Sequence, residues 1–519
     1  MSRKEKSIAD LPNEFIHRIL RYSDPGAIRS CTLVCHRLHD IVRQSTELRY
    51  LFELGLDGLV DCATSTSSYH ERLKDVLERR RSWANISWRK SSSIRLPGRG
   101  EHLSAYDCVA GVLAKLSQHR TFIAVHLPSI NDPVPHWIKH ELAFPAKTFA
   151  MDPTQDLVVF LEKDPRPKGY NGQRSNSSLT FDVPPYTEFR LKTNYIWFSC
   201  IKLAADIVLM QYNIGHEWMC FRFWNWMTGH DWMIEGYPGY FVDCSFISSR
   251  AVMLTSTRGM GSLHVYTFEF EGPSPAHVTL KANLHLPKVR QGIYYEPVET
   301  RTTPILGLAR TPASKTTVPS LESQLNMMSM KYGIGDDEYL FHLFVPNSLL
   351  LGYATNPWVG EVGWEDWGPQ NTRLIETTHM PSGLRFANGF RVISSPTDDP
   401  LQPAASIQIY DFNPSRRQEY DVPLTDFGAT QRSYSNAYVI HREIFEEDVL
   451  TRLPVWHTSR SLDPYYWNFF IDDERIVGMK NPADDDSDDS DCEDIERRVP
   501  ATIARIWRTT GPTVPDVND

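Results

Sequence analysis

Short apolar runs recur along most of this chain, and their spacing constrains the possible fold more than any other feature. The runs follow turns that often contain Asp or Arg, and they recur at intervals of roughly 40 to 50 residues or double that. Asp156, Asp206 and Arg250 mark the first of these turns, and the later markers lie near Leu340, Arg391 and Arg475. Within the runs the pattern has a period of two, and prolines fall between them, which indicates short β-strands separated by turns. We therefore expect the later chain to be mostly β.

A repeat of this length with several short strands in each unit predicts a β-propeller. A small twisted sheet cannot bury both of its faces alone, so repeated sheets stack against one another in a ring. About 400 residues at this period predict about six to eight blades. Two unrelated β-sandwiches are an alternative, because strands separated by turns fit both architectures.

The N-terminal part of the chain has a helical period instead. Between residues 16 and 41, apolar side chains recur at three- and four-residue steps, which favours amphipathic helices. Asp24 followed by Pro25 predicts a helix start, with Asp24 as the N-cap and Pro25 in the first helical position. A further helix is expected over residues 69–83. The chain is thus predicted to be an α+β multidomain protein.

These patterns divide the chain into three predicted parts. Residues 1–60 form a small three-helix domain, residues 61–100 a helical linker, and residues 101–519 the propeller-like domain. Within the last part, residues 481–498 are expected to be a disordered acidic loop. The reason is that residues 484–496 hold nine acidic side chains and no basic one, and like charges repel.

Charge limits the classes of partner that the chain is expected to bind. The net charge of -10 comes almost entirely from the acidic run, so the rest of the chain is nearly neutral. A nearly neutral body without a basic stripe argues against a nucleic-acid partner. The cluster Arg79, Arg80 and Arg81 is the exception, and we interpret it as the solvent-exposed face of a helix.

Hydropathy and cysteine usage indicate an intracellular protein. The N-terminal sequence lacks the apolar stretch of a secretory signal, and no apolar run approaches about 18 residues. The eight cysteines include no CxxC pair. We therefore expect reduced thiols, no membrane partner and a cytoplasmic and/or nuclear location. Cys31, Cys35, His36 and His39 are close in sequence, but no second ligand pair follows them, so no metal or other cofactor is predicted.

Residues 8–42 carry an ordered set of motifs. These are Leu11-Pro12, Glu14, an apolar helix pattern at Ile16, Ile19 and Leu20, Asp24-Pro25, and Leu33-Val34-Cys35 followed by Leu38. In order and spacing this segment resembles the F-box family, with one mild departure where Leu48-Arg49 replaces a frequent Leu-Trp pair. The resemblance implies a three-helix module that binds the adaptor subunit of SCF (cullin–RING) ubiquitin ligases.

The apolar side chains of this segment exceed what three short helices can bury by themselves. An exposed apolar patch of this kind marks a protein partner. On this argument and on the resemblance, the predicted adaptor-binding residues are Leu11, Pro12, Ile16, Ile19, Leu20, Val34, Cys35 and Leu38. A helical cap on the propeller is the alternative interpretation of the same patch.

The later chain is similar to a fungal, mostly basidiomycete, class of F-box proteins with propeller-like C-terminal regions. The residues that carry this similarity are Trp224–Gly229, Trp364–Pro369 with Arg373, Leu453-Pro454 and Asp472–Ile476. The similarity implies a shared blade architecture and does not identify a target.

Together these features predict the substrate-recognition subunit of an SCF ubiquitin ligase, a non-catalytic protein in the ubiquitin conjugation pathway. Its F-box binds the adaptor, and through it the cullin, while the propeller binds a target protein. Possible target-binding residues are Trp218, Trp224, Trp226 and Trp232, although tryptophans at blade ends are more often core. No catalytic residue is predicted.

Two alternatives stay open at this point. The first is an F-box scaffold that acts with the adaptor but without the cullin. The second is a propeller enzyme, for which a polar group near the aromatic cluster would be the candidate site. That group consists of His216, Glu217, His230, Asp231 and Asp243, and nothing in the sequence brings these side chains together.

Overall fold

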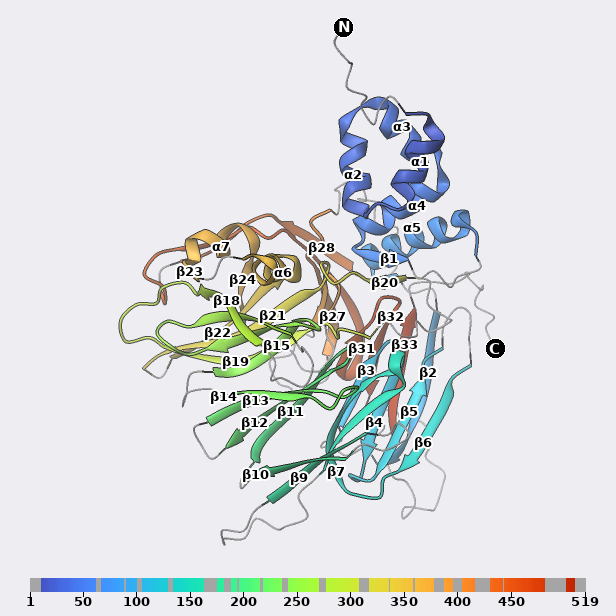
Figure 1. The fold of residues 1–519 in the computed structure, drawn as a ribbon. Coiled ribbons are helices and arrows are strands. Elements are labelled where there is room, and N and C mark those ends of the chain that lie inside the picture. Colours follow the sequence, from blue (N-terminus) through green and yellow to red (C-terminus); the bar gives the residue numbers. More distant parts are fainter. Residues whose placement is uncertain are drawn as a thin grey trace.

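In a computed structural model, a small helical domain sits on one side of a ring of β-sheets (Figure 1). The structure describes residues 11–508 apart from internal segments. Those left out are 62–66, 88–89, 100–104, 129–133, 163–174, 182–187, 194–195, 215–217, 236–240, 270–276, 308–316, 336, 358–359, 378–386, 395–403, 416–429, 442 and 481–500. The predicted acidic loop at 481–498 therefore lies outside the described residues.

Four short helices, rather than three, form the N-terminal domain. They are α1 (Asn13–Arg21), α2 (Pro25–Val34), α3 (His36–Gln44) and α4 (Thr46–Leu56). The predicted start of α2 is confirmed, because the Asp24 carboxylate accepts a hydrogen bond from the Ala27 N–H at 2.9 Å. The additional helix starts where the Ser45 hydroxyl accepts a hydrogen bond from the Leu48 N–H at 3.2 Å.

The helices enclose a core of their own. Its buried members are Ile16, Leu20, Ile28, Leu38, Ile41, Val42 and Leu48. Helix α4 approaches α2 closely at Gly55, where an added Cβ would lie 2.2 Å from Cβ of Pro25. Gly55 therefore permits a contact between the two helices that any larger residue would disrupt.

Helix α5 (Tyr69–Asn85) connects this domain to the ring and confirms the helix expected over 69–83. It begins at a capping box: Ser68 Oγ accepts from the Glu71 N–H at 3.3 Å, and Glu71 Oε2 accepts from the Ser68 N–H at 3.0 Å. Beside it, β1 (Leu59–Asp61) pairs antiparallel with β20 (Thr317–Pro319), a short strand supplied by the propeller region.

The interpretation of the basic cluster as a solvent-exposed helix face is wrong for two of its three members. Arg79 and Arg80 expose only 7% and 8% of their surface, whereas Arg81 is exposed. The guanidinium of Arg79 donates to Thr317 Oγ1 at 3.0 Å. Both arginines are enclosed because α5 packs between α4 and the propeller, a contact that the helical period alone does not reveal.

Among the described residues the ring consists of five sheets of four or five strands and one eight-stranded sheet. We divide the eight-stranded sheet at β31 into two blades, which gives blades 1 to 7. Blade 1 contains β3 (Ala105–Val109), β4 (Val112–Ser117), β5 (Thr121–His126) and β6 (His136–Glu141). Blade 2 contains β7 (Ala146–Asp152), β8 (Leu157–Glu162), β9 (Ser175–Phe181) and β10 (Glu188–Thr193). Blade 3 contains β11 (Ile196–Ala204), β12 (Ile207–Ile214), β13 (Trp218–Asn225) and β14 (Asp231–Glu235).

The remaining blades are less regular. Blade 4 contains β15 (Phe241–Ser248), β16 (Ala251–Ser256), β17 (Ser262–Glu269) and β18 (His277–His285). Blade 5 contains β19 (Tyr294–Thr302), β21 (Leu325–Ile334), β22 (Asp337–Pro346) and β24 (Arg373–Thr377). Blade 6 contains β25 (Ala387–Asn388), β26 (Arg391–Ser394), β27 (Ala404–Asp411), part of β31 (Val455–Ile471) and β28 (Thr430–Ser435). Blade 7 contains the rest of β31, β32 (Arg475–Lys480), β33 (Ala501–Arg508) and β2 (Lys90–Arg99).

One long strand and one distant strand complete the last two blades. The first part of β31 pairs with β27 and the last part pairs with β32, so this strand is shared by two blades of the eight-stranded sheet. Strand β2 pairs antiparallel with β33, in the register Lys90 to Arg508. Residues from both ends of the propeller region thus share blade 7, and the propeller begins at Lys90, inside the segment that was predicted to be a linker.

Every pair of neighbouring blades encloses a hydrophobic core, which confirms the predicted propeller over two separate sandwiches. Separate cores lie between blades 1 and 2, between 2 and 3, between 3 and 4, and between 4 and 5. Another spans blades 5 to 7, and one between blades 7 and 1 closes the ring. Asp156, Asp206 and Arg250 each lie in the turn between the first two strands of a blade, as their spacing predicted.

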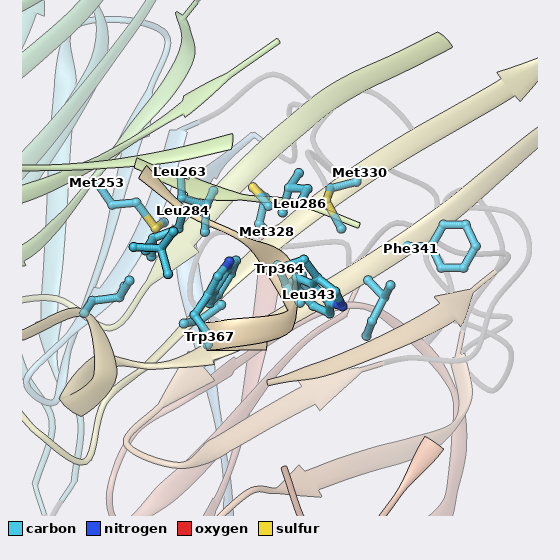
Figure 2. Close-up of a cluster of buried hydrophobic side chains, with 14 of the residues drawn as sticks. Met253, Leu263, Leu284, Leu286, Met328, Met330, Phe341, Leu343, Trp364 and Trp367 are labelled. Atoms are coloured by element: carbon cyan, nitrogen blue, oxygen red, sulfur yellow. The ribbon is translucent and has the colours of Figure 1, made fainter. Parts of the chain in front are cut away.

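Besides the segment that carries β20, two insertions among the described residues depart from the four-strand repeat. Blade 5 carries α6 (Asn347–Thr355), β23 (Gly360–Val362) and α7 (Trp364–Asn371) before its last strand. Blade 6 carries β29 (Tyr438–Ile440) and β30 (Val449–Thr451) before β31. Trp364 and Trp367 of α7 are buried in the core between blades 4 and 5, so the first insertion is part of the packed body (Figure 2).

The helical domain is attached to the ring at blades 5 to 7, since β20, which pairs with β1, lies between β19 and β21 of blade 5. Trp83 of α5 is buried in the core that spans blades 5 to 7, and its indole N–H donates to the backbone oxygen of Asp473 at 3.2 Å. The amide of Asn413, after β27, donates to the backbone oxygen of Leu56 at 2.7 Å. Within the described ranges, none of the helices is both long enough and apolar enough to cross a membrane.

Candidate protein-binding surfaces

Three large apolar side chains form an exposed stripe along α1. Phe15, Ile19 and Tyr22 are spaced by four and three residues, so they lie on one face of the helix. They expose 60%, 42% and 79% of their surface. The adjacent face of α1 is buried through Ile16 and Leu20. An apolar stripe that the protein leaves in water, although it has a complete core beneath it, marks a contact with another protein.

A second exposed apolar group lies at the end of α2. Leu33 and Val34 expose 80% and 69% of their surface, and α2 ends there because Cys35 adopts an extended backbone conformation. This change of direction starts α3 at once. The two side chains are therefore held by ordered backbone on both sides, although they bury little of their own surface.

Arg37 of α3 fixes the entrance to α1. Its guanidinium donates to the backbone oxygen of Leu11 at 2.6 Å and to Asn13 Oδ1 at 2.7 Å. Between these two anchors, Pro12 remains exposed. The Leu-Pro motif is thus presented on a fixed backbone, and Arg37 performs a positioning role that the sequence motifs did not indicate.

The eight predicted adaptor-binding residues divide into three groups. Pro12, Ile19 and Val34 are exposed, while Leu11 and Cys35 are half-buried. Ile16, Leu20 and Leu38 expose only 1%, 2% and 2%, so in this structure they hold the helices together and offer no surface to a partner. Sequence reasoning omitted Phe15, Tyr22 and Leu33. The first two could have been found, because they continue the helical spacing of Ile19 on the face beside the core-facing residues.

The three predicted target-binding tryptophans whose side chains the structure describes do not converge. Trp224 is buried in the core between blades 2 and 3, and Trp232 is buried between blades 3 and 4, on the other face of the same sheet. Trp232 stacks on Phe223 with the ring centroids 3.9 Å apart. Trp226 is half-buried and donates to the backbone oxygen of Ala205 at 3.2 Å. Trp218 lies in β13, and its side chain is outside the described part of the structure.

This arrangement corrects the idea of a shared tryptophan pocket. Trp232 of β14 pairs with Phe223 of β13 and shares its face, whereas Trp224, the next residue of β13, points to the opposite face of the sheet. The alternative that the sequence left open, a core role for tryptophans at blade ends, describes both residues.

The described members of the polar group near blade 3 also lie apart. Asp231, in the last strand of blade 3, forms an ion pair with Arg222. Asp243, in the first strand of blade 4, contacts Lys202 Nζ at 2.9 Å and accepts from the Thr300 hydroxyl at 2.6 Å. Asp231 is thus engaged within blade 3, whereas Asp243 joins blades 3, 4 and 5 through Lys202 and Thr300. His216 and Glu217 lie outside the described residues.

Cys31 and Cys35 are partly buried and pack against the core of the helical domain. Over the described ranges, no group of three or more His, Cys, Asp or Glu side chains is arranged to hold a metal ion.

Comparison with known proteins identifies the N-terminal segment. Residues 8–50 match the family model of the F-box-like domain, which agrees with the resemblance that the motifs carry. No curated protein matches the sequence. The fungal class suggested by the later motifs stays a prediction.

Several solved structures of propellers are similar to the chain at low identity. "Structure of U3-55K" shares 9% identity with a TM-score of 0.32, covering 79% of this chain and 98% of that one. "Crystal structure of RRP9 WD40 repeats" shares 9% with a TM-score of 0.33, covering 80% and 97%. The WD40 domain of SCAP from fission yeast shares 8% with a TM-score of 0.29, covering 81% and 98%. The propeller assignment itself rests on the strand pairing and on the cores between blades.

Proposed function

We propose, from the premise that this chain carries an F-box-like domain followed by a propeller, that it is a substrate-recognition subunit of an SCF ubiquitin ligase. The F-box-like domain binds the adaptor subunit, and the propeller binds a target protein. The chemistry of ubiquitin transfer belongs to other subunits. The contribution of this chain is proximity, because holding a target beside the charged enzyme raises its local concentration.

The exposed apolar stripe on α1 carries this proposal. Phe15, Ile19 and Tyr22 face solvent on a domain that already has a closed core, so they are available to a partner. Large aromatic and apolar side chains of this kind are frequent anchors of protein interfaces. Together with Pro12 and Val34, the stripe forms the surface that we assign to the adaptor.

The attachment of the F-box-like domain to the ring supports a role in positioning. Arg80 of α5 binds both Glu53 and Asp57, and Trp83 of the same helix is buried in the propeller core. A helix anchored at both ends holds two binding surfaces at a fixed separation. A substrate receptor needs this geometry, since the target must stay within reach of the enzyme.

The proposal is tested by measuring adaptor binding to the full chain with calorimetry. The double variant Phe15→Glu with Ile19→Glu places two charges on the stripe, and we expect adaptor affinity to fall at least about 30-fold, as for interface anchors. Gln44→Glu adds a charge at an exposed position at the end of α3 and serves as the matched control, for which affinity should not change. Equal affinity of the double variant and the wild type would refute the assigned surface.

Recovery of the cullin separates the ligase from the scaffold alternative. If the full chain recovers the adaptor and the cullin together from host lysate, the ligase assignment is supported. If it recovers the adaptor alone, the F-box scaffold is the better description.

A further inference from the structure

The two insertions of blades 5 and 6 meet at the outer edge of blade 4. Strand β23 of the first insertion adds to blade 4 as a fifth strand, parallel to β18, with Glu361 opposite Asn283. In repeat proteins, insertions into individual repeats lie in loops on one face, which is often the binding face. The place where two insertions meet is therefore a candidate binding position on the ring.

The first insertion is firmly seated. Trp364 and Trp367 of α7 expose 6% and 1% of their surface, and Figure 2 shows both among the core side chains of blades 4 and 5. The indole N–H of Trp367 donates to the backbone oxygen of His285 at 2.8 Å. Helix α7 is thus a rigid wall beside β18.

The second insertion forms another wall through backbone hydrogen bonds. The Glu446 N–H donates to the oxygen of Lys288 at 2.9 Å, and the Arg290 N–H donates to the oxygen of Ile444 at 2.9 Å. The Arg452 N–H donates to the oxygen of Pro369 at 2.8 Å, which joins this wall to α7. Three segments that are far apart in the chain are therefore locked around one space.

That space, which we call the blade 4 cavity, has a volume of about 1160 Å³. Pockets for small molecules usually enclose about 300–1,000 Å³, so the blade 4 cavity exceeds what a single small ligand needs. It suits a short stretch of polypeptide with several side chains. Apolar residues contribute to its lining, among them Met260, Leu280 and Leu450.

The walls of the cavity are strongly acidic. Its lining contains the carboxylates of Glu361, Glu365, Asp366, Glu446, Glu447 and Asp448, against the basic side chains of Arg258 and Lys288. All six carboxylate residues are exposed to solvent. Carboxylates gathered from both insertions around one cavity create a negative potential that favours a cationic ligand.

Contacts at the edge of blade 4 keep the negative charge of the cavity at neutral pH. The Asn283 amide donates to Glu361 Oε2 at 2.7 Å, and this hydrogen bond lowers the pKa of the Glu361 carboxyl, so Glu361 is ionised at neutral pH. Burial lowers the pKa of His264, opposite Asn283, to about 4, so this ring adds no positive charge at neutral pH. His264 Nδ1 and Asn283 Oδ1 are also buried without a hydrogen-bond partner. Both residues line the cavity, so these two atoms are available for hydrogen bonds to a ligand.

From this geometry we propose that the blade 4 cavity binds a segment of a partner protein that carries Lys or Arg side chains between apolar residues. The basic side chains pair with the carboxylates of the two insertions, and the apolar ones contact the apolar part of the lining. As the site of target recognition this inference rests on the proposed function, whereas the binding itself requires only the propeller.

Fluorescence anisotropy with the purified full chain tests this proposal without any adaptor present. The probe is a short fluorescein-labelled peptide of alternating Lys, Arg and Leu, and the comparison peptide has Glu in place of each basic residue. We expect the basic peptide to bind, the acidic one not to bind, and added salt to weaken binding. The double variant Glu365→Lys with Glu446→Lys should lower the affinity by about 10-fold or more.

The matched control variant is Glu269→Lys with Glu376→Lys, which reverses two exposed carboxylates that do not line the cavity. It should bind the basic peptide like the wild type. Photo-crosslinking of the basic peptide to the wild-type chain gives a readout that does not depend on how a variant folds, and the adducts should map to residues 258–260, 361–369 and 446–450.

Absence of binding, equal affinity for the two peptides, equal effects of the two double variants, or crosslinks elsewhere on the ring would each overturn the proposal. Because the adaptor takes no part in these measurements, their failure leaves the assignment of the α1 stripe untouched. Conversely, loss of that assignment would not alter the peptide binding expected here.

Discussion

The Arg80 guanidinium lies 2.7 Å from Asp57, measured from Nε to Oδ1, and both side chains are more than nine-tenths buried. A second carboxylate, that of Glu53, accepts from Arg80 Nη1 at 2.7 Å, and the backbone oxygen of Glu53 accepts from Nη2 at 2.9 Å. These neighbours overcome the opposing effect of burial and raise the pKa of Arg80. The pairing joins α5 to α4, so it is the link between the F-box-like domain and the helix that enters the propeller.

Arg80→Ala should destabilise the F-box-like domain by about 3–5 kcal/mol, because removal of one partner leaves two buried carboxylates without a counter-charge. Urea unfolding followed by circular dichroism measures the change. Arg81→Ala is the matched control, since the neighbouring arginine is exposed, and its effect should stay within about 0.5 kcal/mol. Similar effects of the two substitutions would contradict the structural role of Arg80.

Trp224→Ala should lower the free energy of unfolding by about 3–5 kcal/mol, because it leaves a large cavity between blades 2 and 3. Trp226→Ala should have a smaller effect, since the side chain is only half-buried. Thermal unfolding of both variants provides the comparison. A stable Trp224→Ala protein that loses binding to its target would instead restore the recognition role that the sequence suggested.

Deletion of residues 501–519 should open the ring, because it removes β33 and leaves β2 and β32 without the strand between them. We expect the unfolding midpoint to fall by at least about 5 °C. Deletion of residues 509–519 removes no described strand and is the control. If the longer deletion melts like the shorter one, pairing of β2 with β33 does not close the propeller.

The stability of the chain should depend on His264 between about pH 6.5 and pH 4. Burial lowers the pKa of His264 to about 4 in the folded state, from an ordinary value near 6.5, with a partly opposing effect of Glu361. Below pH 6.5 the unfolded chain therefore binds more protons than the folded one, and stability falls as pH decreases. At pH 7 this contribution is fully present.

His264→Gln should reduce the loss of stability between pH 7 and pH 5, as measured by urea unfolding at both values. His441→Gln, at an exposed histidine, is the control and should follow the wild type. An identical pH dependence in the wild type and His264→Gln would show that the buried ring does not contribute.

Local sequence determined much of the secondary structure of this protein. Asp24 with Pro25, and Ser68 with Glu71, each define a helix start through contacts within three residues, so spacing alone predicts them. The recurring apolar runs likewise predicted short strands and a propeller of about the observed size, because the period of two and the length of the repeat can both be read along the sequence. The F-box-like domain could be recognised for the same reason, since its motifs lie within 43 consecutive residues.

Tertiary structure alone decided which surfaces are available to a partner. Arg79 and Arg80 belong to a basic cluster that is typical of a solvent-exposed helix face. They are nevertheless buried, because α5 packs between two domains. Closure of the ring pairs Lys90 with Arg508, and the blade 4 cavity joins segments near residues 260, 365 and 447. Burial and charge at such places depend on contacts between residues that are hundreds of positions apart, and no local pattern encodes those contacts.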